Sequence, residues 1–153
     1  MTERVTKLRF HRRPSPVLPE HRPMYKIGQV LLVLQIASHG GKSRLARLHL
    51  LNWALKRPER QMQLITASQS KRLAVEAWGF DPALAIAIRF AISEGLIEET
   101  STGYGISESG RDFVQLLTKN VDLFVAEKNF LEKIGKRVTE AMVDEVASGW
   151  EKL

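Results

Sequence analysis

The chain has 153 residues, no cysteine and a formal net charge of +6. Its length and its composition, 44% hydrophobic and 26% charged, fit one globular domain with one core. Without cysteine it can form no disulfide, thiol redox centre or cysteine-based zinc site. The longest apolar stretch, 27–37, is shorter than the ~20 residues of a membrane-spanning helix, and residues 1–23 lack the apolar region of a secretory signal. We therefore expect a cytoplasmic protein that does not enter a membrane.

The charge is unevenly distributed along the chain. Residues 1–23 carry six basic and two acidic side chains, and residues 24–80 carry nine and two. Residues 81–153 carry eight basic and thirteen acidic side chains. A basic first half suits a polyanion such as DNA or an acidic partner surface, whereas the second half would repel phosphates.

Residues 1–23 predict an extended basic arm. Four prolines are spread through its second half, and each removes an amide donor and biases the preceding residue toward extended geometry. Basic arms of this kind often contact nucleic acid. The arm residues predicted to bind a polyanion are Arg9, Arg12, Arg13 and Arg22.

Two helices are predicted after the arm. Apolar residues recur at helical spacing over 24–38, and two glycines then stop the helix. Ser43 is the expected N-cap of a second helix, 44–56, which has two apolar stripes and should therefore be central to the core. Residues 59–78 predict shorter helices over 60–67 and 71–77. The basic residues predicted to bind a polyanion here, with a solvated helix face as the alternative, are Lys42, Arg44 and Arg47.

A further helix is predicted from Pro82 to residue 94. Asp81 is its expected N-cap, proline suits its first position, and Gly95 can adopt the left-handed conformation that ends it. Short strands over 96–100 and 104–106 then flank a Ser-Thr-Gly turn. Ser107 is the expected N-cap of the next helix. Its residues expected to face the core are Phe113, Leu116 and Leu117.

This order of helix, strand, wing, strand and helix resembles that of winged-helix proteins. We therefore predict a mainly α fold with a small β-hairpin. Its parts would be a basic proline-rich arm (1–23), a winged-helix domain (24–120) and a C-terminal helical extension packed on it (121–153). In the extension, apolar residues at helical spacing predict helices from 121 to about 134 and over 138–147, which serve either core packing or a dimer or partner interface.

The helix before the wing is unsuited to reading DNA bases. A helix in the major groove must offer hydrogen-bonding side chains, but Arg89 is the only strongly polar residue between 82 and 92. Glu98 and Glu99 lie beside the wing and would repel phosphates. We therefore expect this helix to face a protein. The predicted partner-binding residues, two of them in the C-terminal extension, are Ile86, Arg89, Phe90, Phe130 and Ile134.

No catalytic, cofactor-binding or metal-binding residues are predicted. The Gly-Lys-Ser segment at 41–43 follows a helix rather than a strand and lacks the first glycine of a phosphate-binding loop. The four histidines are not at the spacing of metal ligands. An enzyme is therefore the least favoured class.

Three segments also carry a family resemblance. They are Arg-Leu-His-Leu-Leu-Asn-Trp-Ala-Leu-Lys at 47–56, Gly-Leu-Ile at 95–97 and Phe-Leu-Glu-Lys-Ile-Gly-Lys-Arg-Val-Thr-Glu at 130–140. With these segments the chain resembles the middle components of bacterial ABC-three-component conflict systems, including Lamassu-type antiphage systems. The resemblance implies a small winged-helix subunit beside an ABC or SMC-like ATPase and a separate effector, in a complex that senses invading DNA.

Two functions therefore remain in contention. The first is a non-catalytic adaptor subunit of an antiphage defence complex, docking on the ATPase, with non-specific DNA contact as an open addition. The second is a free-standing, dimeric DNA-binding transcriptional regulator. Neither requires a cofactor.

Overall fold

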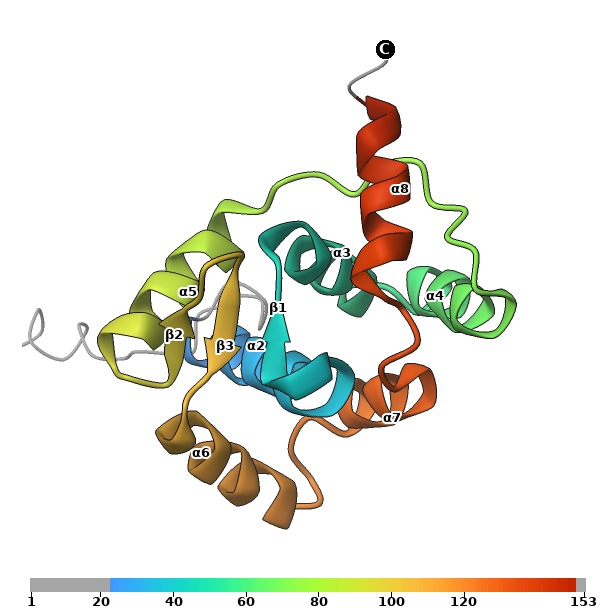
Figure 1. Ribbon diagram of the computed structural model, residues 1–153. Helices are drawn as coiled ribbons and strands as arrows, with labels where there is room; N and C mark the ends of the chain where they lie inside the picture. The colour runs from blue at the N-terminus through green and yellow to red at the C-terminus, as the bar shows by residue number, and fades with distance from the viewer. Residues whose placement is uncertain (1–22, 151–153) are drawn as a thin grey trace, which may run out of the picture.

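The computed structural model describes residues 23–150 and is mainly helical with one small antiparallel sheet (Figure 1). The predicted arm, apart from Pro23, lies outside the described residues, as do its four arginines. None of the described helices is long and apolar enough to cross a membrane. In chain order, the elements are α2 (Pro23–Ala37), η2 (His39–Gly41), β1 (Lys42–Ser43), α3 (Leu45–Leu55), α4 (Pro58–Ser70), α5 (Pro82–Ser93), β2 (Ile97–Glu99), β3 (Tyr104–Ile106), α6 (Glu108–Lys119), α7 (Val125–Ile134) and α8 (Glu140–Trp150).

Helix α2 forms the centre of the core. Its sequence is apolar on nearly every side, so it must be covered from several directions. Helices α3, α5, α6 and α7 all pack against it, and Leu31, Leu32 and Leu34 are completely buried. Helix α3, which we expected to be central, packs on α2, α4 and α8, as its two apolar stripes require.

The hairpin is present as predicted, but it belongs to a three-stranded sheet in the order β1-β3-β2. Strand β2 pairs with β3, and β1 pairs with the other edge of β3, with Lys42 opposite Gly105. Ser43 is therefore a strand residue, and the prediction that it caps α3 is wrong. Its hydroxyl donates to the carbonyl of Arg44, and Arg44 is the N-cap residue.

Helix α4 is one continuous helix, so the predicted break near 68–70 and the predicted helix over 71–77 are both wrong. Ser68 lies within α4, and its hydroxyl donates to the carbonyl of Ile65 at 2.7 Å. Lys71 ends the helix in the left-handed conformation. The irregular segment that follows is held to the core by Trp78, whose indole N–H donates to the carbonyl of Ala46.

The ends of α5 and α6 are as predicted. The Asp81 side chain accepts a hydrogen bond from the amide of Ala83, Gly95 has a φ of 75°, and the Ser107 hydroxyl accepts from the amide of Gly110. The inward face of α6 is only partly as predicted. Phe113 packs against the core as expected, but Leu116 is 62% exposed, and Val114 is the buried apolar residue of this helix.

Helix α7 begins four residues later than predicted because Phe124 has a left-handed backbone conformation. Its ring stacks on Tyr25 and occupies the space beside Gly28, where a Cβ atom would lie 2.5 Å from it. Helix α8 likewise begins after residue 138, although Val138 itself is completely buried. The C-terminal helices thus pack on the rest of the chain, and α7 contacts both α2 and α4.

Candidate docking surface

Helix α5 has one buried and one exposed apolar face. Its buried residues pack toward α2 and β2, and they are Leu84, Ala87, Ile88 and Ala91. Ile86 and Phe90 are each 49% exposed and lie one turn apart, so their side chains are neighbours on one face. Arg89, also exposed, is the only charged side chain of the helix. The predicted partner-binding residues of α5 thus lie together at the surface.

The hairpin beside α5 adds negative charge and no positive charge. Glu98 and Glu99 on β2 are exposed, and the turn residues Ser101 and Thr102 are exposed and uncharged. The carboxylates of the hairpin repel phosphates, and Arg89 is the only cation that α5 offers to a base edge or a phosphate. The chemistry of α5 and the hairpin therefore fits a protein partner better than DNA.

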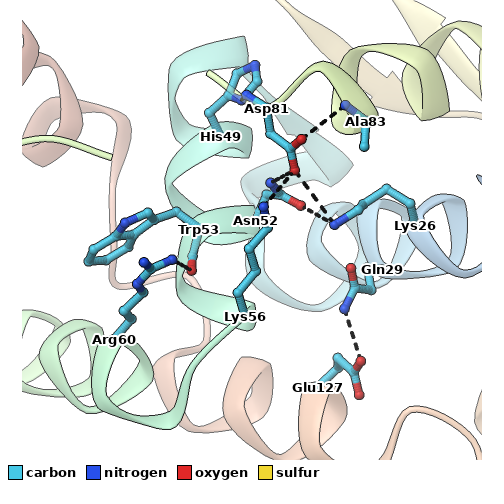
Figure 2. Close-up of polar contacts among 10 residues, drawn as sticks. All are labelled: Lys26, Gln29, His49, Asn52, Trp53, Lys56, Arg60, Asp81, Ala83 and Glu127. Carbon is cyan, nitrogen blue, oxygen red and sulfur yellow. Dashed lines mark hydrogen bonds and ion pairs between the residues drawn. The ribbon is translucent and has the colours of Figure 1, made fainter. Parts of the chain in front are cut away.

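A buried cluster of polar side chains holds the beginning of α5 in place (Figure 2). The Asp81 carboxylate accepts from Asn52 Nδ2 and from Lys56 Nζ, each at 2.9 Å, and lies 4.0 Å from Lys26 Nζ. Lys26, only 1% exposed, also donates to Asn52 Oδ1 at 2.8 Å. Burial alone would raise the pKa of Asp81, but the hydrogen bonds from Asn52, Lys56 and the Ala83 amide lower that pKa to about 2. The cluster therefore ties α5 to α2 and α3 through an ionised carboxylate.

Sequence reasoning identified Asp81 as a helix cap but missed this cluster. The available signal was the spacing of Asn52 and Lys56, which lie one turn apart on α3. A buried carboxylate, Glu127 on α7, accepts from Gln29 Nε2 at 3.0 Å (Figure 2). It also accepts from the Tyr25 hydroxyl. It joins α7 to α2 in the same way.

The two predicted partner-binding residues of the C-terminal extension lie in the core. Phe130 is 3% exposed and Ile134 is completely buried. Neither side chain is accessible to a partner, which corrects the expectation that they form an interface and favours the alternative of core packing. The apolar side chains exposed near this helix are instead Val121, Leu123 and Val125.

The three basic residues predicted to form one patch on the folded body have different roles. Arg47 is 3% exposed and donates to the carbonyls of Val138 and Ala37 and to the Ser38 hydroxyl. Burial lowers its pKa, and the charge of Glu140 partly offsets this. Arg47 therefore joins buried segments and cannot contact a polyanion, which corrects that prediction.

The other two residues of the predicted patch are exposed. Arg44 forms an ion pair with Asp144 on α8 at 2.9 Å, and Lys42 lies on β1. On α4, Arg60 stacks over the ring of Trp53 and donates to its carbonyl (Figure 2). Some basic side chains of the first half therefore form contacts within the protein. Lys42, Arg44 and Arg47 do not form one exposed basic patch, because Arg47 is buried.

Within residues 23–150, no three His, Asp or Glu side chains converge in a way that could hold a metal ion. No protein-family model, curated protein or solved structure matches the chain.

Proposed function

We propose that this chain is a non-catalytic winged-helix adaptor subunit of a multi-protein antiphage defence complex, and that it docks on an ABC or SMC-like ATPase through α5. The observation that carries the proposal is the pair of half-exposed side chains Ile86 and Phe90 on the helix before the hairpin. Large apolar side chains clustered at a surface are typical of protein interfaces.

The element order supports the winged-helix assignment. A winged helix has three helices followed by a hairpin, and a short strand after the first helix completes its sheet. Here α2, α3 and α5 take the places of the three helices, β2 and β3 form the hairpin, and β1 pairs with β3. Helix α4 is an addition between the second and third of these helices.

The test is co-expression with the ATPase and effector encoded beside the gene. We expect the chain to co-purify with the ATPase and Ile86→Glu to abolish this, because a carboxylate would be desolvated in an apolar interface. Leu116→Glu is the matched control, since Leu116 is an exposed leucine on α6 and not on α5. The adaptor function would be excluded if the wild-type chain stayed alone, and the α5 surface would be excluded if both variants co-purified equally.

A free-standing transcriptional regulator is the second candidate, favoured by the nine basic side chains between residues 24 and 80. It requires dimeric binding to its own promoter with a clear preference for sequence. Binding that falls with salt but ignores sequence would exclude it.

A further inference from the structure

A basic groove lies between η2, the end of α4 and the start of α8. Its volume is about 500 Å³. The groove residues are His39, Lys71, Lys136, Arg137, Thr139 and Met142. They come from three parts of the chain that are far apart in sequence, so the fold brings the three cations Lys71, Lys136 and Arg137 together.

One of the three cations of the groove is held in place by backbone carbonyls, and the other two are on exposed side chains. Lys71 ends α4, where its backbone amide donates to the carbonyl of Ala67 at 2.8 Å. The Arg137 guanidinium donates to the carbonyls of Ile134 and Lys133. A cation that is already restrained loses less conformational entropy when it binds a ligand.

Among residues 23–150, no acidic side chain lines the groove. Glu140, the nearest carboxylate along the chain, is turned toward α3, where it accepts from the amide of Arg44 at 3.0 Å. The floor is provided by Met142, which is 9% exposed, and by the Thr139 side chain, which accepts from the Met142 amide. The groove thus has Met142 and Thr139 at its floor and the positively charged side chains of Lys71, Lys136 and Arg137 around it.

We propose that this groove binds the phosphate backbone of a nucleic-acid strand without regard to sequence. Phosphates are spaced regularly along a strand, so an open groove with three separate cations can contact several of them, and the floor can take a sugar or base. An acidic peptide would need carboxylates at matching positions. Helix α5 lies on the opposite side of the molecule from α4, α7 and α8, so the inference does not depend on the docking surface (Figure 1).

The test is fluorescence anisotropy of a labelled 20-nucleotide single strand with the full chain over a range of salt concentrations. Lys71→Glu with Lys136→Glu should weaken binding at low salt by about tenfold or more. The pair should also reduce the log–log salt slope by about 1.4, because each phosphate contact to a single strand contributes about 0.7. The matched control, Arg57→Glu with Lys119→Glu, changes the net charge equally at exposed sites outside the groove. It should weaken binding less than threefold. Ile86→Glu should bind like wild type, which separates this site from the docking surface.

Three results would overturn the proposal. The first is equal weakening by the groove and control pairs, which would mean that only overall charge matters. The second is displacement of the oligonucleotide by polyglutamate at equal residue concentration, which would assign the groove to an acidic protein surface. The third is no binding by the wild-type chain at low salt. Circular dichroism melting of each variant establishes that the compared proteins are folded.

Discussion

The partly buried carboxylate of Asp81 gives the sharpest test of how α5 is positioned. Asp81→Asn keeps a side chain that can cap the helix but removes the negative charge from between Lys56 and the buried Lys26. Asp81→Ala removes both the charge and the cap. The difference between the two variants therefore isolates the cap, and the Asn variant isolates the charge.

The expected loss of stability in each variant follows from the pKa of Asp81. Lowering the Asp81 pKa from 3.8 to about 2 corresponds to about 2 kcal/mol, and the 19% exposure of the side chain reduces this to about 1–2 kcal/mol for Asp81→Asn at pH 7. Loss of the cap adds about 1 kcal/mol, so Asp81→Ala should lose about 2–3 kcal/mol. Urea unfolding followed by circular dichroism measures both values.

The pH dependence of stability tests whether the negative charge of Asp81 stabilises the fold. Because the pKa of Asp81 is lower in the folded chain, its charge stabilises the fold above about pH 4, and this contribution is lost as the pH falls toward 2. The gap between wild type and Asp81→Asn should therefore be full at pH 5–7 and close near pH 2. A gap that is unchanged between pH 7 and pH 2 would refute the charge-based reasoning and leave only a packing effect.

Four further substitutions are tested through the same unfolding measurement. Arg47→Met should lower the free energy of unfolding by about 2–4 kcal/mol, because it leaves several buried acceptors without a donor. A loss below about 1 kcal/mol would contradict the role given to this side chain. Gly110→Ala should lower the free energy of unfolding by more than about 2 kcal/mol, since the new Cβ would lie 2.3 Å from the carbonyl oxygen of Leu96. Its control is Gly149→Ala in α8, where the new Cβ meets no neighbour. That variant should be neutral or more stable by up to about 1 kcal/mol. Leu116→Glu, at an exposed position, should change stability by less than about 0.5 kcal/mol, and a larger loss would mean that the residue is covered in solution.

The features predicted correctly from the sequence are those encoded within a few residues. Asp81, Gly95 and Ser107 each satisfy or permit a local backbone geometry at a helix end, and each acts as expected. The hairpin was predictable for the same reason, because both of its strands and its turn lie within 97–106. Such signals need no knowledge of the rest of the fold.

The features that were missed depend on partners far away in sequence. Strand β1 has two residues and exists because β3, some 60 residues later, pairs with it. Arg47 looked like a surface cation because one of its acceptors, Val138, is 91 residues away. Phe124 delays the start of α7 because its ring fits beside Gly28 on α2. No local pattern carries this information.

The candidate docking surface shows why periodicity alone could not choose between α5 and α7. An apolar residue at helical spacing is known to share a face with its neighbours, but only the fold decides whether that face is covered. In α7 the apolar face that includes Phe130 and Ile134 is covered by the core. Helix α5 is apolar on more than one side, but α2 and β2 pack against one side of it. Ile86 and Phe90, on another side, are therefore exposed. The exposed apolar side chains, rather than the apolar character of the helix as such, make α5 the stronger candidate for a partner contact.

The basic groove lies on the opposite side of the molecule from α5, so a partner on α5 and a nucleic-acid strand in the groove would not compete for the same surface (Figure 1). A saturating concentration of oligonucleotide should therefore leave co-purification with the ATPase unchanged.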